Sequence, residues 1–196
     1  TPATLEQVYT SITEPADPQQ QQALVVHAQS DHNGAFYQKR EHFERLGQHY
    51  QLVLVECDTE AELLEWVSET ANDRGALDLL VIGGHGYSEA LALGEGGDRA
   101  NVDSDDEWLE QLAAHLDEEA DVVLVSCSAG SGEGSLAEIL SETLPGRTIH
   151  APSEDGHLDR FHFDEEGRLD AVDYNAPSRE FEDGRFEERN REKAND

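Results

Sequence analysis

Lysine, cysteine and long apolar runs are scarce in this chain of 196 residues. Lysine occurs only at Lys39 and Lys193, and 13 basic residues face 44 acidic ones, which gives a formal charge of −31. Such a charge repels phosphate backbones and anionic lipids, so we expect neither a nucleic-acid nor a membrane partner. Two cysteines are too few for a disulfide framework, so free thiols are expected. No apolar run approaches the roughly 18 residues that span a bilayer, which predicts a soluble domain.

The surplus of carboxylates over lysines resembles the composition of proteins from salt-accumulating halophiles. In such proteins the carboxylates keep the surface hydrated in concentrated salt, and screening weakens their mutual repulsion. The resemblance implies a cytoplasmic protein of a halophile, with secretion left open. An acidic domain from a mesophile is the alternative interpretation.

Strand-length apolar runs alternate with helical patterns along most of the chain, which predicts a single α/β domain over residues 23–176. Capping boxes at Thr59, Ser104 and Ser135 predict the starts of three helices, and another helix is expected over Phe36–Tyr50. This order predicts a mostly parallel sheet with helices on both faces. The expected parallel strands are Ala23–His27, Gln51–Cys57, Leu77–Ile82, Asp121–Ser126 and Thr148–Ala151.

The two ends of the chain differ in composition from the region between them. Residues 1–22 contain three prolines and a run of glutamines, so we expect a leader segment outside the sheet. The short runs Arg160–Phe163 and Leu169–Val172 predict an antiparallel C-terminal hairpin at the sheet edge. Residues 177–196 are charged, with two phenylalanines as their apolar anchors, which predicts an exposed tail.

Two of the predicted strands end abruptly in small residues that surround a reactive side chain. Leu77–Gly86 reads Leu-Asp-Leu-Leu-Val-Ile-Gly-Gly-His-Gly, and Asp121–Gly130 reads Asp-Val-Val-Leu-Val-Ser-Cys-Ser-Ala-Gly. If both strands lie in one parallel sheet, their carboxyl ends open on the same edge, where open α/β sheets hold their sites. We therefore predict that His85 and Cys127 lie side by side as a catalytic dyad.

A cysteine hydrolase needs a base beside its thiol and hydrogen-bond donors that face the oxyanion. His85 is the predicted acid/base that takes the proton of Cys127 and returns it to the leaving amine. Glycine lets the backbone approach a substrate closely, so the N–H groups of Cys127 and of Gly84 or Gly86 are the predicted oxyanion donors. Cys57 also follows a strand, but it lacks a glycine-rich turn and is expected to be structural.

A strand ending in His-Gly, followed by a strand ending in a cysteine within a Ser/Gly-rich turn, resembles the caspase-like superfamily of cysteine peptidases. The resemblance covers about residues 23–155, and the spacing of His85 and Cys127 is compatible with the caspase interval of about 50 residues. It implies a caspase-like three-layer sandwich, a thioester on Cys127 and a peptide or protein substrate. Since bacterial members are attached to larger effector or surface proteins, it also implies association with such a protein.

The departures from animal caspases concern substrate specificity. The turn Ser126-Cys127-Ser128-Ala129-Gly130 replaces the caspase pentapeptide, and no arginine stands where an aspartate-binding pocket needs one. The turn looks closer to bacterial and separase-like members, which tend to cleave after basic residues. The side chains expected to line the substrate pocket are Asp31, Ser126, Glu154 and Asp155.

Two other interpretations stay open. One is a catalytically inactive domain of the same fold that binds a protein partner, and the other is a Rossmann-like domain that binds a small ligand. The glycine-rich loops match neither the P-loop pattern nor the full dinucleotide fingerprint. Ser131 does not lie in a Gly-x-Ser-x-Gly elbow, and the remaining histidines lack metal-ligand spacing. We therefore expect no metal and no cofactor.

Overall fold

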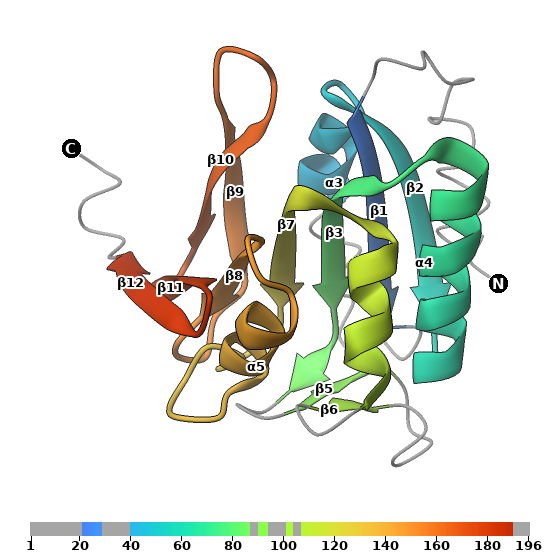
Figure 1. The fold of residues 1–196 in the computed structure, drawn as a ribbon. Helices are drawn as coiled ribbons and strands as arrows, with labels where there is room; N and C mark the ends of the chain where they lie inside the picture. Colours follow the sequence, from blue (N-terminus) through green and yellow to red (C-terminus); the bar gives the residue numbers. More distant parts are fainter. Residues whose placement is uncertain (1–20, 29–39, 87–89, 94–100, 104–106, 190–196) are drawn as a thin grey trace, which may run out of the picture.

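A mixed sheet with mostly parallel strands forms the centre of the molecule (Figure 1). The computed structural model describes residues 21–28, 40–86, 90–93, 101–103 and 107–189. The order across the central sheet is β12-β11-β8-β7-β3-β1-β2. Its parallel strands are β1 (Gln21–Ala28), β2 (Tyr50–Cys57), β3 (Leu77–Gly83), β7 (Leu116–Val125) and β8 (Thr148–Pro152).

Each predicted parallel strand is confirmed, and most ends agree within two residues, although β7 begins earlier, at Leu116. The strands are easy to recognise because they are covered on both faces and therefore read as continuous apolar runs. In β1, for example, every residue after Gln21 is buried. Among the described helices, none is long and apolar enough to cross a membrane.

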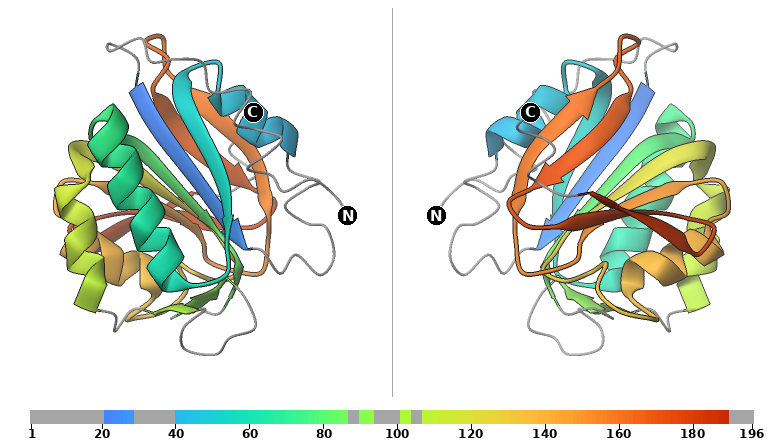
Figure 2. Two further views of the ribbon diagram at one scale, coloured as in Figure 1. Left: turned by 90° about the vertical axis from the view of Figure 1, so that its right-hand side faces the viewer. Right: turned by 90° about the vertical axis from the view of Figure 1, so that its left-hand side faces the viewer.

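Helices cover one face of the sheet (Figure 2). The hydroxyl oxygen of Thr59 accepts a hydrogen bond from the Glu62 N–H (3.2 Å), and that of Ser135 accepts one from the Glu138 N–H (3.2 Å), as the capping boxes predict. The box at Ser104 lies outside the described residues, and the helix that follows it is a 3-10 helix. The elements on this face are α4 (Glu60–Arg74), the 3-10 helix η2 (Glu107–Ala114) and α5 (Leu136–Thr143).

The opposite face is covered by a short helix, α3 (Arg40–Leu46), together with a hairpin of β9 (Leu158–Phe163) and β10 (Leu169–Tyr174) (Figure 2). The prediction that this hairpin extends the sheet edge is wrong, because β9 and β10 form a separate two-stranded sheet. The predicted helix over 36–50 is described only from Arg40 and ends at Leu46.

Apolar and tyrosine side chains explain why the hairpin lies on the face. Leu158, Phe161 and Val172 join the core beneath it. The Leu169 N–H donates to Tyr50 Oη (2.8 Å), and Tyr174 Oη donates to Leu124 O (2.8 Å). Burial raises the pKa of Tyr50 to about 12, so this phenol remains neutral at physiological pH.

Residues 178–189 of the predicted tail form two strands that complete the sheet, although most of the residues from Glu182 to Glu188 are exposed, as predicted. β11 (Ser178–Glu182) pairs antiparallel with β8, and β12 (Arg185–Arg189) pairs antiparallel with β11 (Figure 1). β11 is retained because it satisfies the open edge of β8 and because Phe181 enters the core. Residues 190–196 and residues 1–20 of the predicted leader lie outside the described residues, and β1 already begins at Gln21.

Candidate active site

The turns that carry His85 and Cys127 follow neighbouring parallel strands. Gly83 at the end of β3 is the register partner of Val125 at the end of β7, so each predicted site residue lies two positions beyond a matched pair. One residue further along, the Gly84 N–H donates to Val125 O (3.1 Å), so the two chain segments remain hydrogen-bonded where the strands end. Because adjacent strands lie about 4.8 Å apart, the sheet brings the two turns together at its carboxyl edge.

Gly86 and Ser126 mark a close approach of the two turns. A Cβ atom at Gly86 would lie 2.1 Å from Ser126 Oγ and 2.7 Å from Ala90 O. A Cβ atom at Gly84 would lie 2.3 Å from a methyl carbon of Leu91. Both glycines are therefore required by packing within the protein, whereas the sequence analysis attributes them to the approach of a substrate.

His85 belongs to a small antiparallel sheet at the carboxyl edge. It is formed by β4 (His85–Gly86), β5 (Ala90–Ala92) and β6 (Asn101–Asp103), in which His85 is the register partner of Ala92. The His85 side chain is exposed. Strand pairing therefore holds the backbone while the imidazole remains accessible.

The Cys127 turn, residues 126–131, is sharply bent and is held by the loop that follows β8. Cys127 is partly buried, and its Sγ lies 3.8 Å from Gly156 O. Ser128 has a φ of +59°, which is strained for a residue with a side chain. The strain is supported by hydrogen bonds from the Ser128 N–H to Glu154 O (3.3 Å) and from Ser128 Oγ to Asp155 Oδ1 (3.2 Å).

The predicted oxyanion donors differ in whether their N–H groups already form hydrogen bonds within the protein. The Gly84 N–H donates to Val125 O, so of the two predicted alternatives, Gly84 and Gly86, the structure favours Gly86. None of the hydrogen bonds found among the described residues uses the Cys127 N–H. Cys127, with Gly86 opposite, therefore remains as the candidate donor pair.

The predicted pocket residues are only partly brought together. Glu154 and Asp155 contact Ser128 of the Cys127 turn, as described above. Ser126 is 3% exposed and lies beneath Gly86, so it does not line an open pocket. Asp31 lies outside the described residues.

A depression of about 500 Å³ lies beside the Cys127 turn, and two of its charged residues are absent from the sequence prediction. Arg179 and Glu188 come from β11 and β12, the segment interpreted as a tail. The sequence does contain a signal for them, because Asp183-Gly184 between two short runs is typical of a hairpin turn. The depression is lined by Ser131, Ser153, Glu154, Pro177, Ser178, Arg179 and Glu188.

The central region of the chain matches a known protein family. Residues 48–169, more than half of the chain, match the family described as a domain of unknown function, DUF8616. The chain belongs to the DUF8616 family. No curated protein matches its sequence. The part of this DUF8616 protein that matches the family includes His85 and Cys127 but ends before β11 and β12.

The second cysteine of this DUF8616 protein lies in a different environment. Cys57 is fully buried at the end of β2. β2 is three strands from β7 in the sheet, which corresponds to a distance of about 14 Å. Across the described ranges, no group of three or more His, Cys, Asp or Glu side chains is placed to hold a metal ion.

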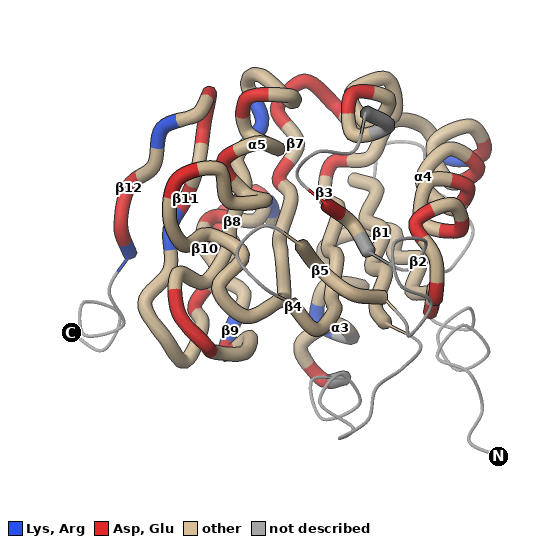
Figure 3. Tube along the Cα trace, turned by 90° about the horizontal axis from the view of Figure 1, so that it is seen from below, with Lys and Arg blue, Asp and Glu red and all other residues tan. Residues whose placement is uncertain are grey.

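Acidic residues outnumber basic ones, 44 to 13, in the chain that forms this site. Figure 3 views the molecule towards the carboxyl edge, with β4 and β5 near the centre, and shows Asp and Glu spread over the helices and loops. Lys and Arg occupy few positions in the same view.

Proposed function

We propose that this DUF8616 protein is a cysteine endopeptidase with Cys127 as nucleophile and His85 as acid/base. The close approach of their two turns, with Gly86 against Ser126, is the observation that carries the proposal. The accessible imidazole and the partly buried thiol also support it, since both groups can meet a bound peptide.

The proposed reaction proceeds through a thioester. The Cys127 thiolate attacks the scissile carbonyl carbon, and His85 transfers its proton to the amine as the C–N bond breaks. A water molecule then gives a proton to His85 and attacks the thioester, which releases the carboxylic acid and regenerates the thiol. The N–H groups of Cys127 and Gly86 are the proposed donors to the oxyanion in both steps.

We further propose that the fold is a caspase-like sandwich. The parallel strands β1, β2, β3, β7 and β8, the antiparallel strands after β8 and the covering layers on both faces support this assignment. The location of the proposed dyad at the carboxyl ends of neighbouring strands agrees with the resemblance noted in the sequence.

We propose that the enzyme recognises a basic side chain of its peptide substrate. Glu154 and Asp155 beside the Cys127 turn support this choice, as does the charge of −31. The same acidic composition supports a salt-accumulating halophile as the source. Association with a larger effector protein and a cytoplasmic location also remain proposals.

Cleavage of a mixed-sequence peptide library in molar KCl tests the proposal, with products identified by mass spectrometry. We expect cleavage by the wild type and by Cys57→Ala, and loss of cleavage in Cys127→Ala. Cys57→Ala is the matched control because it removes the other thiol. Equal cleavage by Cys127→Ala and the wild type would contradict the proposal.

A catalytically inactive binding domain is the second candidate. The position of Cys127 Sγ near Gly156 O favours it, because a protonated thiol donates to a carbonyl in this way. Thiol reactivity separates the two candidates. The dyad predicts that Cys127 is alkylated at pH 7 much faster than an ordinary thiol and that His85→Ala slows the reaction, whereas a structural cysteine shows neither effect.

A further inference from the structure

We propose that Arg179 is a positioning residue for Cys127, through which the β11–β12 hairpin maintains the shape of the Cys127 turn. The inference rests on the proposed function, because it concerns the reactivity of the same thiol. It assigns a role to residues outside the region matched by the family.

Arg179 makes three contacts, one to the Cys127 turn and two to β12. Its Nη1 donates to Gly130 O in the Cys127 turn (3.0 Å), and its Nη2 donates to Glu188 Oε1 on β12 (3.2 Å). Its Cζ lies 4.2 Å from the centre of the Phe186 ring. The planar guanidinium is suited to this combination, because it can stack on a ring while donating in its own plane.

Gly130 is held from several directions, so its peptide groups have little freedom. Its N–H donates to Pro152 O at the end of β8 (2.9 Å). A Cβ atom on it would lie 3.1 Å from Phe181 Cε2 and 3.2 Å from Ala151 Cβ. The hydrogen bond from Arg179 fixes the remaining polar group, the carbonyl oxygen.

The position of Gly130 is transmitted to Cys127 through a short turn. The Ser131 N–H donates to Ser128 O (3.0 Å), which closes the turn just after Cys127. Ser128 is also the residue with a strained φ of +59°. A strained conformation persists only while its neighbours hold it. Glu154 and Asp155 hold Ser128 on one side, and in this proposal the bond from Arg179 to Gly130 O adds a second constraint whose loss lets the thiol move.

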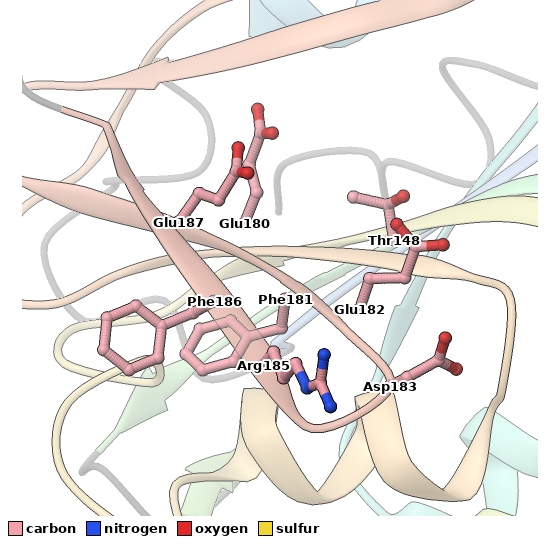
Figure 4. Close-up of a pocket in the computed structure, with 8 residues that line it drawn as sticks. All are labelled: Thr148, Glu180, Phe181, Glu182, Asp183, Arg185, Phe186 and Glu187. Carbon is pink, nitrogen blue, oxygen red and sulfur yellow. The ribbon is translucent and has the colours of Figure 1, made fainter.

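Phe186, which contacts the Arg179 guanidinium, packs in turn against Phe181. Phe181 on β11 and Phe186 on β12 lie with their ring centres 5.5 Å apart, and Figure 4 shows them next to each other. They line a groove of about 670 Å³ on the hairpin. Phe186 is 45% exposed, which is unusual for so large an apolar side chain. Its contact with the guanidinium of Arg179 explains why a phenylalanine lies at this exposed position.

The rate of Cys127 alkylation by iodoacetamide, followed from pH 5 to pH 10 in molar KCl, tests the proposal. All proteins carry Cys57→Ala, so that one thiol is observed. We expect Arg179→Ala to slow the reaction at pH 7 by about tenfold, since small displacements of a reacting group have large effects on rate. We also expect the pH profile of alkylation to differ between Arg179→Ala and the parent protein, because a displaced thiol no longer lies beside the base of the proposed dyad.

Arg179→Lys and Arg185→Ala complete the comparison. Lysine can reach Gly130 O but presents no planar group to Phe186, so an intermediate rate is expected. Arg185→Ala removes a cation from the same hairpin and should retain the wild-type rate and pH profile. If Arg179→Ala unfolds below the assay temperature, as a thermal melt will show, Arg179→Lys alone decides the question.

The outcomes separate this inference from the proposed function. Wild-type rates and pH profiles in the Arg179 variants, together with slow alkylation of His85→Ala, would overturn the positioning role and leave the dyad intact. Equal rates in His85→Ala, the Arg179 variants and the parent protein would overturn both.

Discussion

Gly86 is confined by atoms of neighbouring segments rather than by its own backbone angles. A methyl group there would overlap Ser126 Oγ and Ala90 O, at 2.1 and 2.7 Å. One contact is to the strand that follows the turn and the other to the residue before Cys127. The glycine is therefore the point at which the packing of the site is least tolerant of change.

Gly86→Ala is expected to lower the free energy of unfolding by about 1–3 kcal/mol, the usual effect of overpacking, and to slow alkylation of Cys127. Gly132→Ala is the control, since Gly132 has open space around it and only its φ of +79° opposes a side chain. We expect about 1 kcal/mol of destabilisation there and unchanged alkylation. Urea unfolding and alkylation kinetics measure both effects, and an unaffected Gly86→Ala would show that the two turns are further apart.

At the scale of elements, Asp173 joins the hairpin on the face to the hairpin at the edge. Asp173 on β10 accepts hydrogen bonds from Arg189 Nε and Nη2 on β12 (2.9 and 2.7 Å), and His162 Nε2 on β9 lies 2.5 Å from its other oxygen. Burial opposes ionisation of Asp173, but His162 and Arg189 outweigh it and hold its pKa below the ordinary value.

Asp173→Asn is expected to destabilise the protein by about 1.5 kcal/mol at pH 7, as loss of charged hydrogen bonds does. A lowered pKa stabilises the folded state above the unfolded value of about 3.9, and this contribution disappears as the pH falls through the folded value. The difference between wild type and variant should therefore begin to shrink as the pH falls below about 4, and it should keep shrinking until the pH passes the lower folded value. Chemical unfolding at several pH values measures the difference, with Asp170→Asn, at an exposed position on β10, as control. A difference that does not shrink between about pH 5 and pH 2 would refute the argument.

At the scale of the whole molecule, electrostatic repulsion opposes the folded state. The formal charge is −31, and Figure 3 shows Asp and Glu distributed along most of the elements of the described chain. Salt shortens the Debye length from about 10 Å at 0.1 M to about 3 Å at 1 M, so it weakens this repulsion.

We expect the thermal midpoint to rise between 0.1 and 2 M KCl. A gain of about 2 kcal/mol corresponds to roughly 4–8 °C for a domain of this size. Sucrose of equal water activity is the control, because it is excluded from the protein surface without screening charge. An equal rise in sucrose would contradict an electrostatic origin, and a fall in KCl would contradict the resemblance to halophilic proteins.

The sequence identifies the centre of the molecule well and its periphery poorly. The continuous apolar runs are Ala23–Val26 in β1, Leu79–Ile82 in β3 and Val122–Val125 in β7. They are apolar because both faces of the sheet are buried there, and such runs are visible without knowledge of the fold. The caps at Thr59 and Ser135 are equally local. The shared edge for the turns of His85 and Cys127 follows from parallel pairing of the strands that precede them.

The sequence by itself determined where the parallel strands lie and which reactive residues follow them, because burial and capping leave their pattern within a few consecutive residues. Only the tertiary structure decided that β9–β10 covers a face and that β11–β12 closes the edge beside Cys127. Those placements depend on distant partners, such as Tyr50 for Leu169 and Gly130 for Arg179. In the sequence the same segments are charged and short, so their pattern alone does not reveal which surface they will cover.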